Sequence, residues 1–90
     1  MVDVKEAVAA AVAFMKHVLE PSRATELLLE EVELARAEDG HQVWRVTISM
    51  PAPQVLSNML SGARDYKTLT VDAESGQVQS MRIRELAGAR

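Results

Sequence analysis

The feature that most constrains this chain is the alternation of side chains between residues 41 and 50, which read HQVWRVTISM. Every second residue is apolar, at Trp44, Val46, Ile48 and Met50, and the residues between them are polar. A period of two is typical of a β-strand with one buried and one wet face. The chain is therefore expected to build a sheet with a single apolar face around a strand at 42–50.

The segment before this strand, TELLLEEVELARAE at residues 25–38, fits two structures. Its Leu, Glu, Ala and Arg content favours a helix by intrinsic propensity. Against that, Val32 and Leu34 alternate with acidic residues, and Glu38-Asp39-Gly40 is a turn signal just before the next strand. We interpret residues 28–37 as a strand, with a helix as the alternative.

The hydrophobic pattern selects the turn between these two strands. A two-residue loop would place Val32 and Leu34 on the face opposite Trp44, which is wrong for a one-sided core. A three-residue loop with Gly40 in the left-handed conformation pairs Leu34 with Trp44 and Val32 with Val46. It also sets Glu33 across from Arg45 on the wet face.

A second hairpin with the same turn pattern is predicted near the C-terminus. Its strands are residues 65–72 and 77–85, joined through Glu74-Ser75-Gly76 with Gly76 left-handed. The same register argument pairs Leu69 with Met81, Lys67 with Ile83 and Thr68 with Arg82.

A helix is predicted at residues 3–19, ahead of both hairpins. Asp3 and Glu6 have the spacing of a capping box, and Pro21 ends the helix. At 100° per residue an apolar stripe runs along one face of this helix. The stripe consists of Val4, Ala7, Val8, Ala11, Val12, Met15, Val18 and Leu19.

The insertion between the hairpins, residues 51–64, is long for so small a chain. Pro51 and Pro53 are not expected within a central strand. Val55, Leu56, Met59 and Leu60 have the spacing of a short amphipathic helix. This segment is expected either to cover one end of the core or to form a contact surface.

Ninety residues leave room for one domain, residues 1–90. The predicted fold class is α+β, with one N-terminal helix packed on a four-stranded antiparallel sheet made of two hairpins. A long loop or short helix joins the hairpins, and the strands are expected to follow one another as a meander.

Composition excludes several classes of function. Without Cys the chain has no disulfide framework and no thiolate site, so a cytoplasmic location is expected. The net charge of −3 comes from intermixed acidic and basic residues, which leaves no basic face for nucleic acid. Lys16 and His17 interrupt the apolar N-terminal stretch, so neither a membrane span nor a targeting segment is expected.

Catalytic, metal and cofactor sites are not predicted. The only two histidines, His17 and His41, lack the further ligands that zinc requires. The serines lie in no nucleophile or phosphate-binding motif. Glu31 and Glu33 are interpreted as a solvated charge ladder rather than an acid and base pair. The chain is therefore not expected to be an enzyme.

The wet face of the sheet is the remaining candidate site, because one helix covers only one side of a sheet. Tyr and Arg are frequent in interface hot spots. The predicted partner-binding residues are Arg45, Tyr66, Arg82 and Arg84 on this face and Val55, Leu56, Met59 and Leu60 in the insertion.

The function expected from these residues is a small non-catalytic protein-interaction or regulatory module that contacts another protein or a second copy of itself. The alternative is a small-molecule-binding or enzymatic domain that uses a pocket between the helix and the sheet.

Two sequence words, Trp44-Arg45-Val46-Thr47-Ile48 and VDAESGQV at residues 71–78, resemble small bacterial PepSY-like domains. The similarity extends from Asp3 to Glu85. It implies a helix packed on an antiparallel sheet and a non-catalytic binding module. Some PepSY-like domains are associated with protease inhibition. The insertion from Pro51 to Ala63 departs from that pattern, so inhibition is not expected here.

Overall fold

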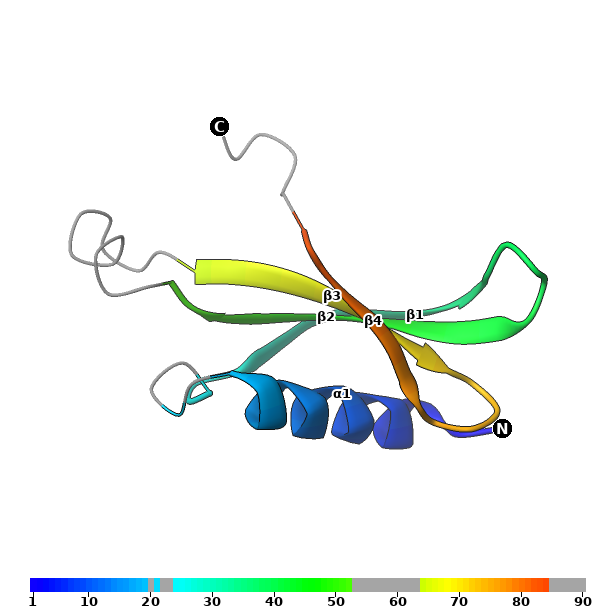
Figure 1. Ribbon diagram of the computed structural model, residues 1–90, viewed down its shortest axis with the longest axis horizontal. Helices are drawn as coiled ribbons and strands as arrows, with labels where there is room; N and C mark the ends of the chain where they lie inside the picture. The colour runs from blue at the N-terminus through cyan, green and yellow to red at the C-terminus, as the bar shows by residue number, and fades with distance from the viewer. Residues whose placement is uncertain (20, 22–23, 53–63, 85–90) are drawn as a thin grey trace.

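The strands in the described part of this protein form one antiparallel sheet, and an N-terminal helix packs across one face of it (Figure 1). The computed structural model describes residues 1–19, 21, 24–52 and 64–84. The elements are helix α1 (Val4–Val18) and strands β1 (Leu28–Arg36), β2 (Gln42–Pro51), β3 (Arg64–Asp72) and β4 (Val78–Ile83). The sheet order is β1-β2-β3-β4, which confirms the predicted α+β fold and its meander.

Helix α1 begins with the predicted capping box. The Asp3 carboxylate accepts the backbone N–H of Glu6 at 2.8 Å, and the Glu6 carboxylate accepts the backbone N–H of Asp3 at 2.9 Å. These two bonds satisfy donors that the first turn of a helix leaves unpaired. The helix ends at Val18 with Leu19 as its extended C-cap, one residue short of the predicted end.

The first hairpin resolves the ambiguity at residues 25–38 in favour of a strand. Leu34 lies opposite Trp44, Val32 opposite Val46 and Glu33 opposite Arg45, in the predicted register. Gly40 has a φ of +92° and donates its N–H to the carbonyl of Ala37 at 2.9 Å, which closes the three-residue loop. A β-bulge at Glu30, which the alternation did not predict, shifts the register at the start of β1.

The second hairpin also has its predicted register, with Leu69 opposite Met81, Lys67 opposite Ile83 and Thr68 opposite Arg82. Gly76 has a φ of +78° and donates its N–H to the carbonyl of Asp72 at 2.8 Å. A second bulge lies between these pairs and the turn, because Thr70 faces Ser80 whereas Val71 faces Val78. Gln79 is therefore the extra residue in β4.

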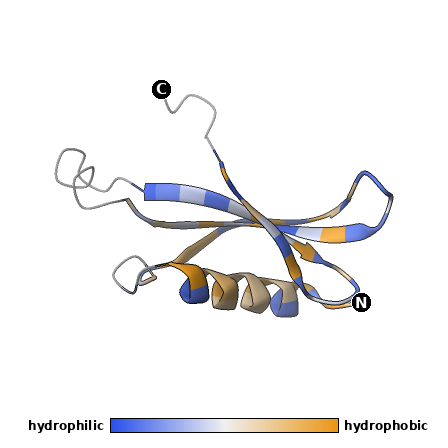
Figure 2. Cartoon of the chain, viewed as in Figure 1, coloured by the Kyte–Doolittle hydropathy of each residue, from blue (hydrophilic) through white to orange (hydrophobic). Residues whose placement is uncertain are grey.

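The core lies between α1 and the two central strands. The helix contributes a narrow buried face, and β2 and β3 contribute alternate side chains. Figure 2 shows apolar residues along most of α1 and a mixture of apolar and polar residues along the strands. The fully buried cluster is Ala7, Ala11, Met15, Val46, Ile48, Met50, Leu69 and Val71. Three of its eight members come from α1, and two of these are alanines, which let the helix backbone approach the sheet closely.

The buried face of α1 is narrower than the predicted apolar stripe. Val4 and Val18, at the two ends of the stripe, are 40% and 46% exposed. Phe14, which is not a member of the predicted stripe, is partly buried and packs against the core. The contact face is centred on Ala11 because the neighbouring strands meet the helix from only one side.

The N-terminal segment is fastened to the sheet ahead of α1. The indole N–H of Trp44 donates to the carbonyl of Val2 at 3.1 Å, and the backbone N–H of Val2 donates to the carbonyl of Ala73 at 2.7 Å. These bonds give the half-buried indole a polar partner. They also fix the end of α1 beside the second hairpin.

The central strands are slightly longer than predicted. Pro51 forms the last residue of β2 and pairs with Arg64, the first residue of β3, whereas both were expected in the insertion. A proline is tolerated there because the strand ends and its missing N–H interrupts no further pairing. Residues 53–63, including the predicted helical turn, lie outside the described residues. No helix in the described part of the chain is long and apolar enough to cross a membrane.

The two left-handed glycines provide a matched stability test. A Cβ at Gly40 would meet nothing within 4 Å, whereas a Cβ at Gly76 would lie 3.2 Å from Cγ1 of Val2. Left-handed backbone costs a residue with a Cβ about 1–2 kcal/mol. We expect both Gly40→Ala and Gly76→Ala to lower the free energy of unfolding, and Gly76→Ala to lower it more. Urea denaturation measures this difference.

Val2→Ala serves as the control, because it removes the atom that the new Cβ approaches. In the Val2→Ala background, Gly76→Ala should cost about as much as Gly40→Ala does. A cost that stays larger in this background would contradict the assigned contact with Val2.

Candidate functional site

The face of the sheet that α1 does not cover carries polar residues from all four strands. The register places Glu31, Arg45, Thr47, Tyr66 and Arg82 on this open face. All four predicted contact residues of the sheet therefore lie on one face. Their side chains differ, however, in how far they are engaged by neighbours.

Arg84 reaches across the open face from the end of β4. Its backbone N–H donates to the carbonyl of Tyr66 at 2.9 Å, and its guanidinium donates to the Thr47 hydroxyl at 3.1 Å. The guanidinium also forms an ion pair with the Glu31 carboxylate on β1. One side chain thus connects the C-terminal end of the sheet to its first strand.

The Arg84 to Glu31 pair perturbs both groups. Hydrogen bonding from Arg84, and its positive charge, lower the pKa of the Glu31 carboxyl. The same contacts raise the pKa of the Arg84 guanidinium. A carboxyl that acts as a general acid at neutral pH needs a raised pKa. The lowered pKa of Glu31 does not suit that role. The shallow polar cavity beside it, about 170 Å³, is lined by Glu30, Glu31, Thr47, Tyr66 and Arg84.

Ser49 and Arg64 form a second internal cluster on the open face. Ser49 is fully buried, donates its hydroxyl to the Glu30 carboxylate at 2.7 Å, and accepts from Arg64 Nε at 2.9 Å. Arg64 also donates to the carbonyl of Glu26 at 2.6 Å, where the backbone is left-handed with a φ of +55°. These contacts hold the turn that leads into β1, and sequence reasoning did not find them.

Arg45 and Arg82 are the more accessible of the predicted contact residues. Arg45 lies opposite Glu33 as predicted, with 3.9 Å between its guanidinium and the carboxylate. An exposed pair at this distance contributes at most about 1 kcal/mol. Arg82 is exposed and lies opposite Thr68. The other predicted contact residues, Val55, Leu56, Met59 and Leu60, lie outside the described residues.

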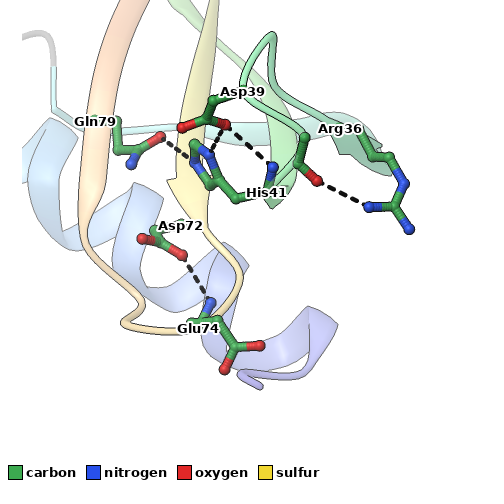
Figure 3. A network of polar contacts seen from close by, with 7 residues as sticks. Arg36, Asp39, His41, Asp72, Glu74 and Gln79 are labelled. Carbon is green, nitrogen blue, oxygen red and sulfur yellow. Dashed lines mark hydrogen bonds and ion pairs between the residues drawn. The ribbon is translucent and has the colours of Figure 1, made fainter.

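A polar network surrounds His41 at the end of the sheet near the hairpin turns (Figure 3). The ring Nδ1 contacts the Asp39 carboxylate, which also accepts the His41 backbone N–H at 3.1 Å. The ring Nε2 lies 3.4 Å from the Gln79 side-chain oxygen. Both ring nitrogens therefore face acceptors, an arrangement that suits the protonated imidazolium. Hydrogen bonding to Asp39 raises the pKa of His41.

The remaining members of this network stabilise turns. Hydrogen bonds from the backbone N–H and the ring of His41 lower the pKa of Asp39. The backbone N–H of Glu74 donates to the Asp72 carboxylate at 2.8 Å and lowers the pKa of Asp72. Arg36 donates to the carbonyl of Gly40 at 2.8 Å. The network joins the two hairpins through the contact between His41 and Gln79. Within the part of the chain that the structure describes, no three His, Asp or Glu side chains are grouped to hold a metal.

An apolar groove lies on the other side of the sheet, between α1 and β1. It has a volume of about 390 Å³ and is lined by Val4, Lys5, Val8, Ala9 and Leu29. Leu29 is 51% exposed although it lies on the helix side of the sheet. The groove exists because the buried face of α1 is centred over β2 and β3, so its N-terminal half leaves β1 partly uncovered.

The outer edge of β1 runs beside this groove. Ala37 donates its backbone N–H to the carbonyl of His41. Hydrogen-bonded positions alternate along an antiparallel strand, so the backbone N–H and C=O groups of Glu31, Glu33, Ala35 and Ala37 point toward β2. Those of Val32, Leu34 and Arg36 therefore point outward, where no described strand pairs with them. Leu34 is also 43% exposed. We call the groove and this edge together the β1 border.

The sequence analysis offered a pocket between the helix and the sheet as an alternative site but did not place it at β1. The available signal was the run Leu27-Leu28-Leu29, which is more apolar than a strand with one buried face requires. A strand that is added to a sheet edge makes main-chain hydrogen bonds and places alternate side chains in neighbouring pockets.

The His41 network makes a pH-dependent contribution to stability that Asp39→Asn tests. The raised pKa of His41 adds stability that is complete below pH 6.5 and is lost as pH rises through the folded pKa. The lowered pKa of Asp39 adds stability above pH 3.8 that is lost as pH falls through its folded value. The difference in unfolding free energy between wild type and Asp39→Asn should therefore be greatest between these values.

Asparagine keeps an oxygen for the His41 backbone N–H but removes the charge. Titration of the His41 ring by NMR should give a pKa above 6.5 in the wild type and a lower one in Asp39→Asn. Identical titration curves in the two proteins would contradict the pairing.

Comparison of the chain with protein-family models, with curated proteins and with solved structures finds no match.

Proposed function

We propose that this protein is a small non-catalytic interaction module that binds an extended polypeptide segment along the β1 border. The observation that carries the proposal is the outer edge of β1, which no strand of the described residues pairs with, beside the apolar groove. The edge offers the backbone groups of Val32, Leu34 and Arg36, and the groove offers apolar walls. Adding a strand to a sheet edge uses backbone bonds for affinity and pockets for specificity.

The groove has the chemistry required for this role. Four of its five lining residues are apolar, and Lys5 contributes a charged head at the rim and an apolar stem. An apolar side chain that fills such a site contributes about 1.5–3 kcal/mol when fully buried. We therefore expect the bound segment to carry an apolar side chain that faces Val8 and Leu29.

The open face is a secondary surface in this proposal. Arg84, Tyr66 and Thr47 already have partners or close neighbours within the chain, so recruiting them would require those contacts to be exchanged. Arg45 and Arg82 are exposed and remain candidate contacts at its rim. Charged groups at a rim influence association rate and partner choice more than affinity.

The alternative function is the binding of a small apolar molecule in the groove between helix and sheet. The volume of about 390 Å³ falls within the usual range for ligand sites, which favours this alternative. Such sites also present a few convergent polar groups that orient the ligand. The groove offers one, Lys5, so the extended polypeptide is the better fit.

The PepSY-like resemblance supports a binding role rather than a catalytic one, and we include that relationship in the proposal. We also propose that the protein is cytoplasmic. The support for this location is the absence of Cys, which leaves the fold without covalent cross-links.

Selection of peptides from a random library displayed on phage tests the proposal. Selected peptides should shift the NMR resonances of Val32, Leu34 and the groove residues. Leu29→Lys should weaken their binding by about tenfold to a hundredfold, because it removes one buried apolar contact. Ile83→Lys is the matched control, since Ile83 is an exposed apolar residue on β4 and is 75% exposed.

A second probe separates backbone pairing from apolar contact alone. Prolines placed at the peptide positions that donate to β1 should abolish binding, whereas prolines at the alternate positions should be tolerated better. Selected peptides that bind Leu29→Lys as tightly as wild type would contradict the proposal. Binding of small apolar probes in the groove without any peptide binding would favour the alternative function.

A further inference from the structure

The two edges of the sheet differ in how well they can accept another strand. Regular pairing in β1 runs from Glu31 to Arg36, because its bulge lies at one end of the strand. In β4, which has only six residues, the bulge at Gln79 leaves regular pairing only from Ser80 to Ile83. The β1 edge is therefore the better template.

A second copy of β1 is the simplest strand that could pair there. Two copies placed side by side in one antiparallel sheet are related by a two-fold axis perpendicular to it, so the residue on the axis faces its own counterpart. A centre at Ala35 would set Glu31 opposite Asp39 of the turn, which leaves Val32, Glu33 and Leu34 as centres. Each of these gives a different set of facing charges.

Charge selects among these three registers. In the register centred on Val32, Glu31 of each copy lies opposite Glu33 of the other, so two pairs of carboxylates face each other. A pair centred on Glu33 sets two Glu33 carboxylates directly opposite each other. A pair centred on Leu34 sets Glu33 opposite Ala35 and Glu31 opposite Ala37, so no two carboxylates face each other. Like charges directly opposite in a sheet are destabilising.

We propose that the segment bound at the β1 border is β1 of a second copy of this chain, paired antiparallel in the register centred on Leu34. This inference rests on the proposed function and names its partner. The two sheets become one continuous sheet with both helices on the same face.

The backbone geometry of β1 agrees with this register. Leu34 then faces Leu34, and Val32 faces Arg36, which are the residues whose backbone groups point outward. Each of these facing pairs exchanges two backbone hydrogen bonds. The Leu34 side chains, 43% exposed in the single chain, cover each other on the helix side. The stem of Arg36 lies beside Val32 of the second copy.

Sedimentation over a concentration series tests the association. The contact is small, so we expect a weak dimer whose mass rises from 9.9 kDa toward twice that value between about 10 µM and about 1 mM. Leu34→Lys should keep the protein monomeric throughout, whereas Ile83→Lys on the opposite edge should associate like wild type. Circular dichroism of both variants checks that each is folded.

Single cysteines determine the register, since the chain has no Cys of its own. In the proposed register the Leu34 Cα atoms lie about 5.5 Å apart, which suits a disulfide. The Glu33 Cα atoms lie about 8 Å apart and those of Val32 about 14 Å apart, both too far to be bridged. Oxidation should therefore cross-link Leu34→Cys at least about tenfold faster than Val32→Cys or Glu33→Cys.

Ile83→Cys, exposed on β4, gives the rate of random collision. Fastest cross-linking through Val32→Cys or Glu33→Cys would overturn the register. A wild-type chain that stays monomeric at about 1 mM would overturn the inference altogether. If that monomer still binds selected peptides in a manner that depends on Leu29, the proposed function stands without a second copy. If the monomer binds no selected peptide, both the proposed function and the inference of a second copy are wrong.

Discussion

The structure depends on the contact between the apolar side of β2 and the alanine face of α1. Val46, Ile48 and Met50 are fully buried on one side of the strand, and Ala7 and Ala11 bring the helix backbone close above the sheet. Burying each of the larger side chains contributes about 1.5–3 kcal/mol, more than any exposed ion pair in the molecule. A chain of 90 residues has few such contacts, so the position of the helix is set by them.

The open face follows from the same alternation. Once β2 directs its apolar residues toward α1, Thr47 and Ser49 must point the other way, and long polar side chains from the neighbouring strands cover them. Thr47 is only 3% exposed although no described helix lies over it. Its hydroxyl bonds to Thr68 at 3.0 Å and to Arg84, so its burial leaves no polar atom unpaired. Hydrogen bonds between its own strands therefore hold the centre of this face together.

The sequence predicted the parts of the fold that obey local rules. The side-chain period fixed the two hairpin registers, because a change of one residue in loop length would have turned Val32 and Leu34 away from the core. It did not predict the bulges at Glu30 and Gln79, which alter the period without any composition signal. Neither did it predict the reach of Arg84 or the groove beside β1, since both depend on how elements distant in sequence are placed in space.

The groove and the free edge have a common origin. Helix α1 has a narrow buried face and covers mainly the two central strands, so both side strands of the four-stranded sheet are only partly covered. On β1, Leu29 and Leu34 stay half exposed although they lie on the helix side, and on β4 Ile83 is exposed on the same side. A large apolar residue held at a sheet edge lowers the solubility of a monomer and gains burial when a strand is added. The acidic residues of β1 limit which strand can be added at this edge. A neutral residue opposite Glu31 or Glu33 is more favourable than another carboxylate.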